Sequence, residues 1–263
     1  MSQHTDPGFH IDADDLPTGY LLSRRETLVL LGGDGASAAI VALGPSVLAQ
    51  SASPGASSAV ASAVPSCIIR PELTEGPYYV ADELERSDIR VDSADGSTVP
   101  GARLDLTWLV SRIDGTGCVP FGGALVDVWH CDAQGVYSGV TDPGFDTSGH
   151  DFLRGVQRTD ATGTATFTTI YPGWYRGRAT HIHFKVRTDP DESTGTELTS
   201  QLFFDDIFTD GVFLAEPYAS TGIRTLRNDG DGIYQQSAGQ TLVTVSQTAD
   251  GYAGTFAIGI QTS

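Results

Sequence analysis

The chain of 263 residues carries 33 acidic and 15 basic side chains, a formal net charge of −18, and Lys185 is its single lysine. This acidity argues against nucleic-acid binding, because phosphate contacts require a basic face, and against docking on anionic membranes. Hydrophobic residues (40%) and charged residues (18%) occur in the proportions of a globular protein of one large or two small domains. The 31 glycines and 13 prolines, with few apolar helical patterns, favour an all-β fold.

Residues 1–49 have the pattern of an export signal. Two adjacent arginines at 24–25 precede a weakly apolar run over 29–48, and a small-residue pattern (VLA) ends at Ala49. A charged region, an apolar region and a small-residue site make up a secretory signal, and paired arginines indicate the twin-arginine route. Asp34 and several glycines interrupt the run, whereas a membrane-spanning helix needs about 20 continuous apolar residues. A retained anchor and an ordinary buried helix stay open as alternatives.

The rest of the chain is expected to divide into two parts. Residues 50–65 are rich in serine and alanine and predict a flexible leader, whereas residues 66–263 predict one folded domain. We expect the exported domain to be extracellular or in the cell envelope, without a membrane span in the mature form. The sequence does not indicate its oligomeric state.

The three cysteines are Cys67, Cys118 and Cys131. Export would permit a disulfide, and three cysteines allow one bridge with one thiol left over. Cys118 and Cys131 flank a predicted seven-residue strand, roughly 23 Å long, whereas bridged Cα atoms lie within about 7 Å of each other. We therefore favour a Cys67–Cys131 bridge, and a pairing that involves Cys118 stays open. No CxxC motif occurs, so a zinc site is not expected.

Short apolar or alternating runs separated by turns are typical of a β-sandwich. The first two runs, 104–110 and 124–130, are expected to form a hairpin through the turn 113–123, and residues 132–151 a long loop. Residues 214–218 predict a helical turn. The further strands are predicted at 157–158, 165–170, 180–186, 201–204, 242–247 and 254–260.

The run His181-Ile182-His183 lies within the predicted strand 180–186. In a strand, residues i and i+2 point to the same face, so both imidazoles can reach one metal ion while Ile182 packs on the opposite face. Two histidines at this spacing also occur as a core or surface pair, and a single tyrosine is more often a core-edge residue than a ligand. Together with Tyr137 and Tyr175, however, the two histidines would form a hard, anionic donor set that suits Fe(III) better than Zn(II) or Fe(II).

Two longer runs, GALVDVWHCDAQGVYSG (123–139) and YPGWYRGRATHIHFKV (171–186), resemble the intradiol ring-cleavage dioxygenases, which include catechol 1,2-dioxygenases and protocatechuate 3,4-dioxygenases. The run PELTEGPYY (71–79) resembles a segment that lines the active site in the protocatechuate enzymes. The resemblance covers about 67–260 and is closest to the secreted single-domain branch. It implies an antiparallel β-sandwich with long active-site loops and a non-haem Fe(III) ion. It also implies O2 as co-substrate, and cleavage of a catechol-type diol between its hydroxylated carbons to a muconate-type diacid.

The resemblance implies a ligand set for the iron. Tyr137, Tyr175, His181 and His183 match the two tyrosinates and two histidines of the family. Tyr175 would also act as a base that accepts a proton from the substrate. Tyr171 is a competing candidate, but it precedes Pro172 and does not fit the family spacing.

Further residues have implied roles around the substrate. Arg178 matches the family arginine beside the reacting carbon, where its permanent charge would stabilise negative charge, and Gln201 matches a supporting glutamine. Tyr78 and Trp174 are candidates for the substrate pocket, with packing roles as the alternative. Glu72 would either form a supporting hydrogen bond or cap local structure.

Other polar or aromatic residues are interpreted as structural. We expect Trp129 in the core, His130 in a structural role and His150 to be solvated without a partner. The run 228–232 (NDGDG) resembles a calcium-type cluster but lacks the EF-hand spacing, and it is interpreted as a turn.

Two other functions remain open from the sequence. A metal-free β-sandwich binding module would keep this fold without the chemistry, although all four implied ligands are present. A copper oxidase or zinc hydrolase would use the same histidines with a different metal. The sequence does not determine which catechol is the substrate.

Overall fold

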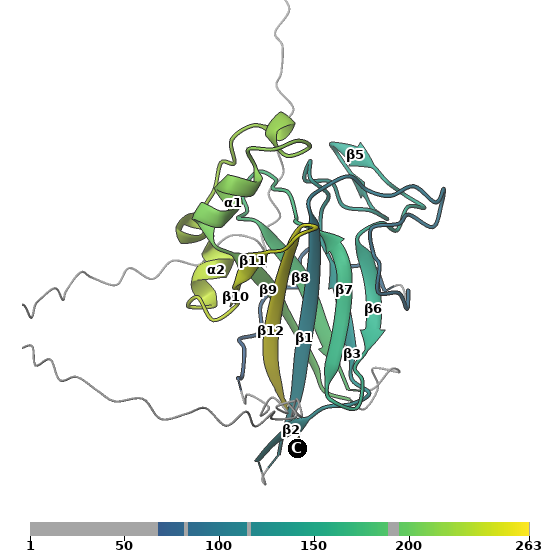
Figure 1. Ribbon diagram of the computed structural model, residues 1–263, viewed down its shortest axis with the longest axis vertical. Coiled ribbons are helices and arrows are strands. Elements are labelled where there is room, and N and C mark those ends of the chain that lie inside the picture. The colour runs from purple at the N-terminus through teal and green to yellow at the C-terminus, as the bar shows by residue number, and fades with distance from the viewer. Residues whose placement is uncertain (1–67, 82–83, 115–116, 189–194, 263) are drawn as a thin grey trace, which may run out of the picture. The chain divides into compact units, whose positions relative to one another are not determined.

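The structure, a computed structural model, describes residues 68–81, 84–114, 117–188 and 195–262 (Figure 1). The expected export signal and leader, with their boundaries, lie outside the described residues. None of the helices in the described ranges has the length and apolar character needed to cross a membrane.

The first sheet is organised around β1 (Arg103–Asp114). Alternate side chains of this strand are buried, from Leu104 to Val110, as expected for a strand with one face on the core. β12 (Tyr252–Gln261) pairs with β1 in parallel, and β11 (Val245–Gln247) extends the sheet beyond β12. On its other side β1 pairs antiparallel with β2 (Gly117–Pro120) and β7 (Thr164–Ile170).

The second sheet has the strand order β10-β9-β8-β3-β6. Its central strands, β3 and β8, are buried along their whole length, because the first sheet covers one face and irregular segments cover the other. The strands are β3 (Leu125–Trp129), β6 (Arg154–Arg158), β8 (His181–Arg187), β9 (Glu197–Phe204) and β10 (Leu242–Val243).

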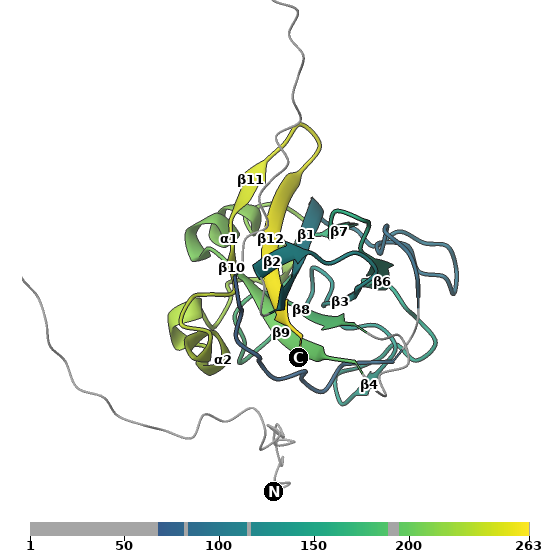
Figure 2. The same cartoon turned by 90° about the horizontal axis from the view of Figure 1, so that it is seen from below.

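Aromatic side chains fill the space between the two sheets. Trp108 of β1 contacts Phe184 of β8 and Phe256 of β12, with ring centroids 4.6 and 5.3 Å apart. All three are at most 2% exposed, and each buried side chain of this size contributes about 1.5–3 kcal/mol. Figures 1 and 2 show the two sheets as layers, with the helices on the side of β10.

The remaining elements are short and lie outside the two sheets. α1 follows β9 directly, and η2, η3 and α2 lie between α1 and β10. A small hairpin, β4–β5, interrupts the long loop after β3. Their bounds are β4 (Thr141–Asp142), β5 (Phe145–Asp146), α1 (Asp206–Val212), η2 (Ala219–Thr221), η3 (Asn228–Gly230) and α2 (Gly232–Gln236).

The all-β sandwich is confirmed, but two predictions of strand pairing were wrong. The strands predicted at 104–110 and 124–130 do not form a hairpin, because β1 continues to Asp114, turns back as β2 and leaves β3 to the other sheet. The pairing is not uniformly antiparallel, since β1–β12 and β9–β10 are parallel. The helical turn predicted at 214–218 is present, because Ala219 N–H donates to the Ala215 carbonyl at 3.1 Å, and the helix α1 precedes it.

The expected Cys67–Cys131 disulfide is wrong. Cys131 is a free thiol at the inner end of β3, 1% exposed and enclosed by Trp129 and Tyr137. Burial raises the pKa of this thiol far above its usual value. Cys118, on the peripheral strand β2, is the disulfide-bonded cysteine, and its partner lies outside the described residues.

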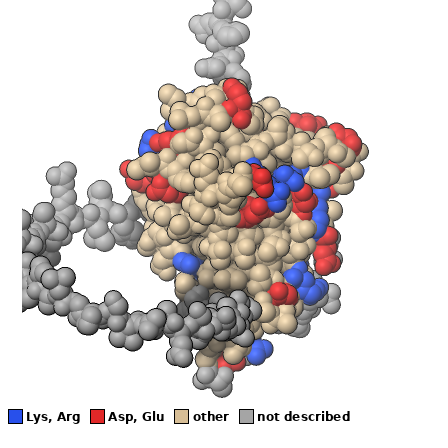
Figure 3. Space-filling view, in the orientation of Figure 1, with Lys and Arg blue, Asp and Glu red and all other residues tan. Residues whose placement is uncertain are grey.

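Several basic side chains on the surface are paired with acidic neighbours. Arg90 contacts Asp88 at 2.7 Å and Arg103 contacts Asp105 at 3.0 Å. On the face in Figure 3, most blue side chains lie next to red ones, and they do not gather into a basic patch among the described residues.

Candidate metal centre

Two imidazoles and two phenols converge at the start of β8. His181 Nε2 lies 3.0 Å from His183 Nε2, 3.3 Å from the Tyr175 hydroxyl oxygen and 3.5 Å from the Tyr137 hydroxyl oxygen. Tyr137 comes from the loop after β3, and Tyr175 from the segment before β8. The structure therefore brings together all four residues that the sequence predicted as iron ligands.

Strand alternation and register put the histidines in place. Ile182, between them, is fully buried in the core between the sheets, so both imidazoles occupy the opposite face of β8. His183 is directly opposite Trp129 on β3 and Gln201 on β9, so these three side chains form one row across the sheet. The indole of Trp129 stacks on the His183 ring with centroids 5.1 Å apart and an angle of 9° between the planes.

A backbone carbonyl determines the tautomer of His181. Its Nδ1 lies 2.6 Å from the Ala179 carbonyl oxygen, which can only accept, so Nδ1 carries the proton. Nε2 then presents a lone pair to the cluster. Burial lowers the pKa of His181 and His183 well below the usual value, so both imidazoles are neutral. Nδ1 of His183 is buried and has no hydrogen-bond partner among the described residues.

The phenol of Tyr137 faces this cluster from a buried position. It is 1% exposed, and burial followed by the nearby Tyr175 raises its pKa well above the usual value. A phenolate would form there only beside a further cation, and the lone pair of His181 Nε2 already points to the same place. Within the described ranges no group of three or more His, Cys, Asp or Glu residues is placed to hold a metal, so a centre here depends on the phenols. The donor set fits Fe(III).

Arg178 borders the cluster and is itself held by two partners. Its Nε donates to Asp231 Oδ2 at 3.0 Å and its Nη2 donates to Gln201 Oε1 at 2.5 Å. Nη1 remains on the side of the cluster, 3.5 Å from His181 Nε2. Gln201 also donates from Nε2 to the Thr74 carbonyl at 2.8 Å. The guanidinium is 7% exposed and is therefore a fixed charge at the edge of the centre.

The two predicted pocket residues lie on the more open side. Tyr175, Tyr78 and Trp174 are only partly buried, unlike the histidines. The Tyr78 ring stacks on Tyr137 at 4.5 Å, and its hydroxyl donates to Asp142 of β4 at 2.8 Å. The Trp174 indole N–H has no hydrogen-bond partner within the described ranges. A substrate would approach the cluster from this side.

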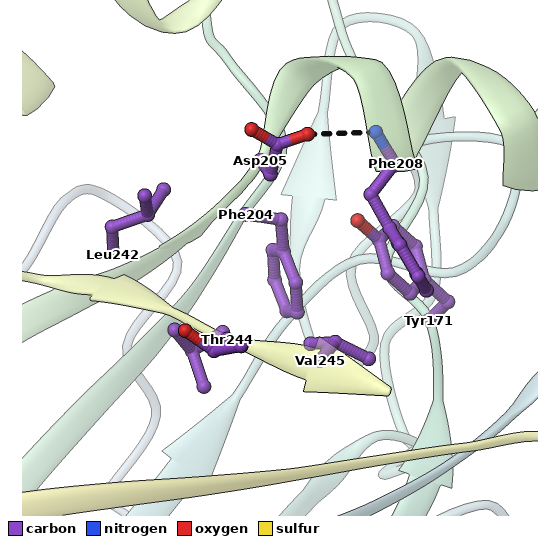
Figure 4. Close-up of a pocket in the computed structure, with 8 residues that line it drawn as sticks. Tyr171, Phe204, Asp205, Phe208, Leu242, Thr244 and Val245 are labelled. Carbon is purple, nitrogen blue, oxygen red and sulfur yellow. Dashed lines mark hydrogen bonds between the residues drawn. The ribbon is translucent and has the colours of Figure 1, made fainter. Parts of the chain in front are cut away.

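Tyr171, the competing ligand candidate, belongs to the core. It is fully buried, its hydroxyl lies 2.7 Å from Thr209 Oγ1, and its ring packs on Phe204 with centroids 4.6 Å apart. Figure 4 shows it beside Phe208 at the wall of a small apolar pocket under α1, which contains none of the four donors.

Other residues singled out in the sequence lie outside the cluster. His130 is buried, with Nδ1 at 2.8 Å from the Cys131 carbonyl and Nε2 at 2.7 Å from Thr169 Oγ1, and burial lowers its pKa to about 4. Glu72 is exposed. His150 was expected to have no partner, which was wrong, because its Nδ1 lies 2.6 Å from Asp92 Oδ2.

Sequence reasoning missed three contributors to the centre. Asp231, in the run interpreted as a turn, is the N-cap of α2 and binds Arg178. Gly76 lies against His183, since a Cβ there would be 3.1 Å from the ring carbon Cε1. Asp142 holds Tyr78. The DG dipeptide at 231–232 carried the local signal of a helix start, and Gly76 lies in the run 71–79 that resembles an active-site segment. No local pattern indicates which distant residue Asp231, Gly76 or Asp142 contacts.

Comparison with known proteins identifies relatives of this chain. A family model described as "Dioxygenase" matches residues 74–227. Catechol 1,2-dioxygenase 1 of Acinetobacter lwoffii is 29% identical over 163 residues, which are 52% of this chain and 49% of that protein. Catechol 1,2-dioxygenase 2 of the same organism is 35% identical over 136 residues, 44% of this chain and 46% of that protein. The chain thus spans about half the length of these relatives.

Solved structures cover more of the fold. An intradiol ring-cleavage dioxygenase from Tetranychus urticae matches with a TM-score of 0.63 and 30% identity, covering 74% of this chain and 95% of that one. A dioxygenase domain from Streptomyces sp. SirexAA-E, described as part of a carbohydrate-binding fusion, matches with a TM-score of 0.51 and 28% identity, over 74% and 99% of the two chains. Because the family model covers more than half of the chain and the donor cluster lies within it, the chain belongs to the intradiol ring-cleavage dioxygenase family.

Proposed function

We propose that the protein is a non-haem Fe(III) intradiol dioxygenase that opens a catechol-type ring between its two hydroxylated carbons. The observation that carries this proposal is the convergence of two phenol oxygens and one further imidazole nitrogen within 3.0–3.5 Å of His181 Nε2. Both atoms of O2 enter the muconate-type diacid, so the reaction needs no external reductant.

The four donors would have two roles, which are binding of the ion and acceptance of a proton from the substrate. A bound Fe(III) would supply the Lewis acidity and electron affinity that make the diol reactive toward O2. Tyr137, His181 and His183 are nearly inaccessible and would be permanent ligands. Tyr175 lies on the open side, where it would both help to hold the ion and accept a proton from one substrate hydroxyl.

Arg178 would act on the substrate rather than on the metal. Its Nη1 is the part of the guanidinium not held by Asp231 or Gln201, and it faces the cluster. A fixed positive charge at this place would stabilise negative charge as it develops on the ring and its oxygens. Tyr78 and Trp174 would form the wall against which the ring lies.

The test is to load the purified protein with iron and offer catechol, hydroxyquinol and protocatechuate. We expect a burgundy colour from tyrosinate-to-iron charge transfer, with one O2 consumed per ring-opened product. Tyr171→Phe, a core tyrosine, is the control that keeps both. A colourless protein after loading, with no turnover of any diol, would favour a metal-free binding module of the same fold.

We also propose that the protein is exported by the twin-arginine route, which the pattern of residues 1–49 supports. Replacement of Arg24 and Arg25 by lysine should retain the protein in the cytoplasm. Secretion that is unaffected by this change would overturn the proposal.

A further inference from the structure

Asp231 is a buried carboxylate that accepts four hydrogen bonds. It is 1% exposed. Its Oδ1 accepts from the backbone N–H groups of Ile233 and Tyr234, at 2.9 and 3.2 Å, and so caps α2. Its Oδ2 accepts from Arg178 Nε at 3.0 Å and from the backbone N–H of Ala179 at 2.7 Å. One oxygen therefore serves the helix and the other serves the metal centre.

The two groups that donate to Oδ2, on Arg178 and Ala179, are each one contact away from His181 in the cluster. Arg178 is kept with Nη2 on Gln201 and Nη1 facing His181. Ala179 is kept with its carbonyl on His181 Nδ1, which leaves the Nε2 lone pair for the metal. The orientation of the guanidinium and the tautomer of the imidazole thus depend on the same carboxylate oxygen.

We propose that Asp231 is a positioning residue for the ring-opening reaction. It aims Arg178 at the substrate and keeps His181 in its metal-binding tautomer, beyond its role as a helix cap. This inference rests on the proposed function, because the groups it positions are those proposed to hold iron and the diol.

An amide cannot replace the carboxylate in this position. Asparagine has one acceptor oxygen and one NH2 donor group, whereas Asp231 meets N–H donors on both sides. In Asp231→Asn, either α2 or Arg178 would face an NH2 group. The change also leaves the buried Arg178 charge without its counter-ion, which is costly inside a protein.

The experiment is a double-mutant cycle of Asp231→Asn, Arg178→Gln and the combined variant. The matched control is Asp205→Asn. Asp205 caps α1 by accepting from Phe208 N at 2.8 Å, and the control therefore makes the same carboxylate-to-amide change at a helix cap away from the centre. Each variant is measured for kcat and KM with catechol, for iron affinity, and for the thermal midpoint of the metal-free protein.

We expect Asp231→Asn to lower kcat about 10–100-fold with a much smaller change in KM, and to weaken iron binding. In the Arg178→Gln background the same change should lower kcat by a clearly smaller factor, because Arg178 is already gone and only the support of His181 through Ala179 remains to be lost. The thermal midpoint of the metal-free protein should fall in each single variant, and the combined loss should be smaller than the sum. Asp205→Asn should keep kcat and iron affinity.

Two results would overturn the inference. One is multiplicative loss of kcat in the double variant, which would mean that Asp231 acts independently of Arg178. The other is an Asp231→Asn protein that resembles Asp205→Asn in kcat and iron affinity, which would make Asp231 a helix cap alone. Failure of the wild-type protein to open any catechol would instead reject the proposed function.

Discussion

Gly76 provides a sharp test of how His183 is held. Its φ of +74° is in the left-handed region, and an added Cβ would be 3.1 Å from Cε1 of the His183 ring. The Trp129 indole is stacked on the same ring with centroids 5.1 Å apart, which limits the room in which the imidazole can shift. Gly76→Ala should therefore strain the backbone and displace a metal-ligating imidazole.

The backbone strain and the displacement of the imidazole can be separated by the size of the stability loss and by a control variant. A left-handed conformation costs a non-glycine residue about 1–2 kcal/mol, which lowers the thermal midpoint by about 2–8 °C in a domain of this size. Gly96 has the same φ of +74°, but an added Cβ there meets nothing within 4 Å. Gly96→Ala should therefore show the backbone cost alone.

The assay combines thermal unfolding of the metal-free proteins with iron titration followed by the visible band. We expect both variants to lose stability, and only Gly76→Ala to bind iron about 10-fold or more weakly, as perturbation of groups around metal ligands usually does. Wild-type iron affinity and an unchanged spectrum in Gly76→Ala would refute the contact with His183.

Three further predictions concern other parts of the centre and the loop beside it. Tyr175→Phe should shift the visible band and slow catechol binding, whereas Tyr171→Phe should cost only about 1 kcal/mol of stability through its lost hydrogen bond; the reverse pattern in absorption and stopped-flow traces would move the ligand to Tyr171. Asp142→Asn keeps an acceptor for Tyr78 but removes a negative charge, so kcat/KM for protocatechuate relative to catechol should rise about 3–10-fold, and an equal ratio would contradict this. The hydrogen bond to Asp92 raises the pKa of His150, so the pair stabilises the fold below the unfolded histidine pKa of about 6.5, and this contribution is lost as pH rises through the folded value. His150→Gln should therefore lower the thermal midpoint at about pH 5.5 and approach wild type at about pH 9; a deficit that grows with pH would reject this assignment.

The sequence alone was sufficient to predict the fold class and the four donor residues of this protein. Alternation in β1 and the spacing of His181 and His183 are properties of neighbouring residues, because side chains in a strand change face at every step. Family resemblance selected Tyr137 and Tyr175 from nine tyrosines. The all-β sandwich and the grouping of the four donors could thus be predicted before the fold was known.

Tertiary structure decided what depends on residues far apart in the chain. Asp231 and Arg178 are 53 positions apart, and the run around Asp231 predicts only a turn. The parallel pairing of β1 with β12, the free thiol of Cys131 and the contact of Gly76 with His183 are likewise absent from any local window. Such contacts form because the two sheets must bury their faces together, so the packing of the whole domain, and not local periodicity, determines which side chains meet.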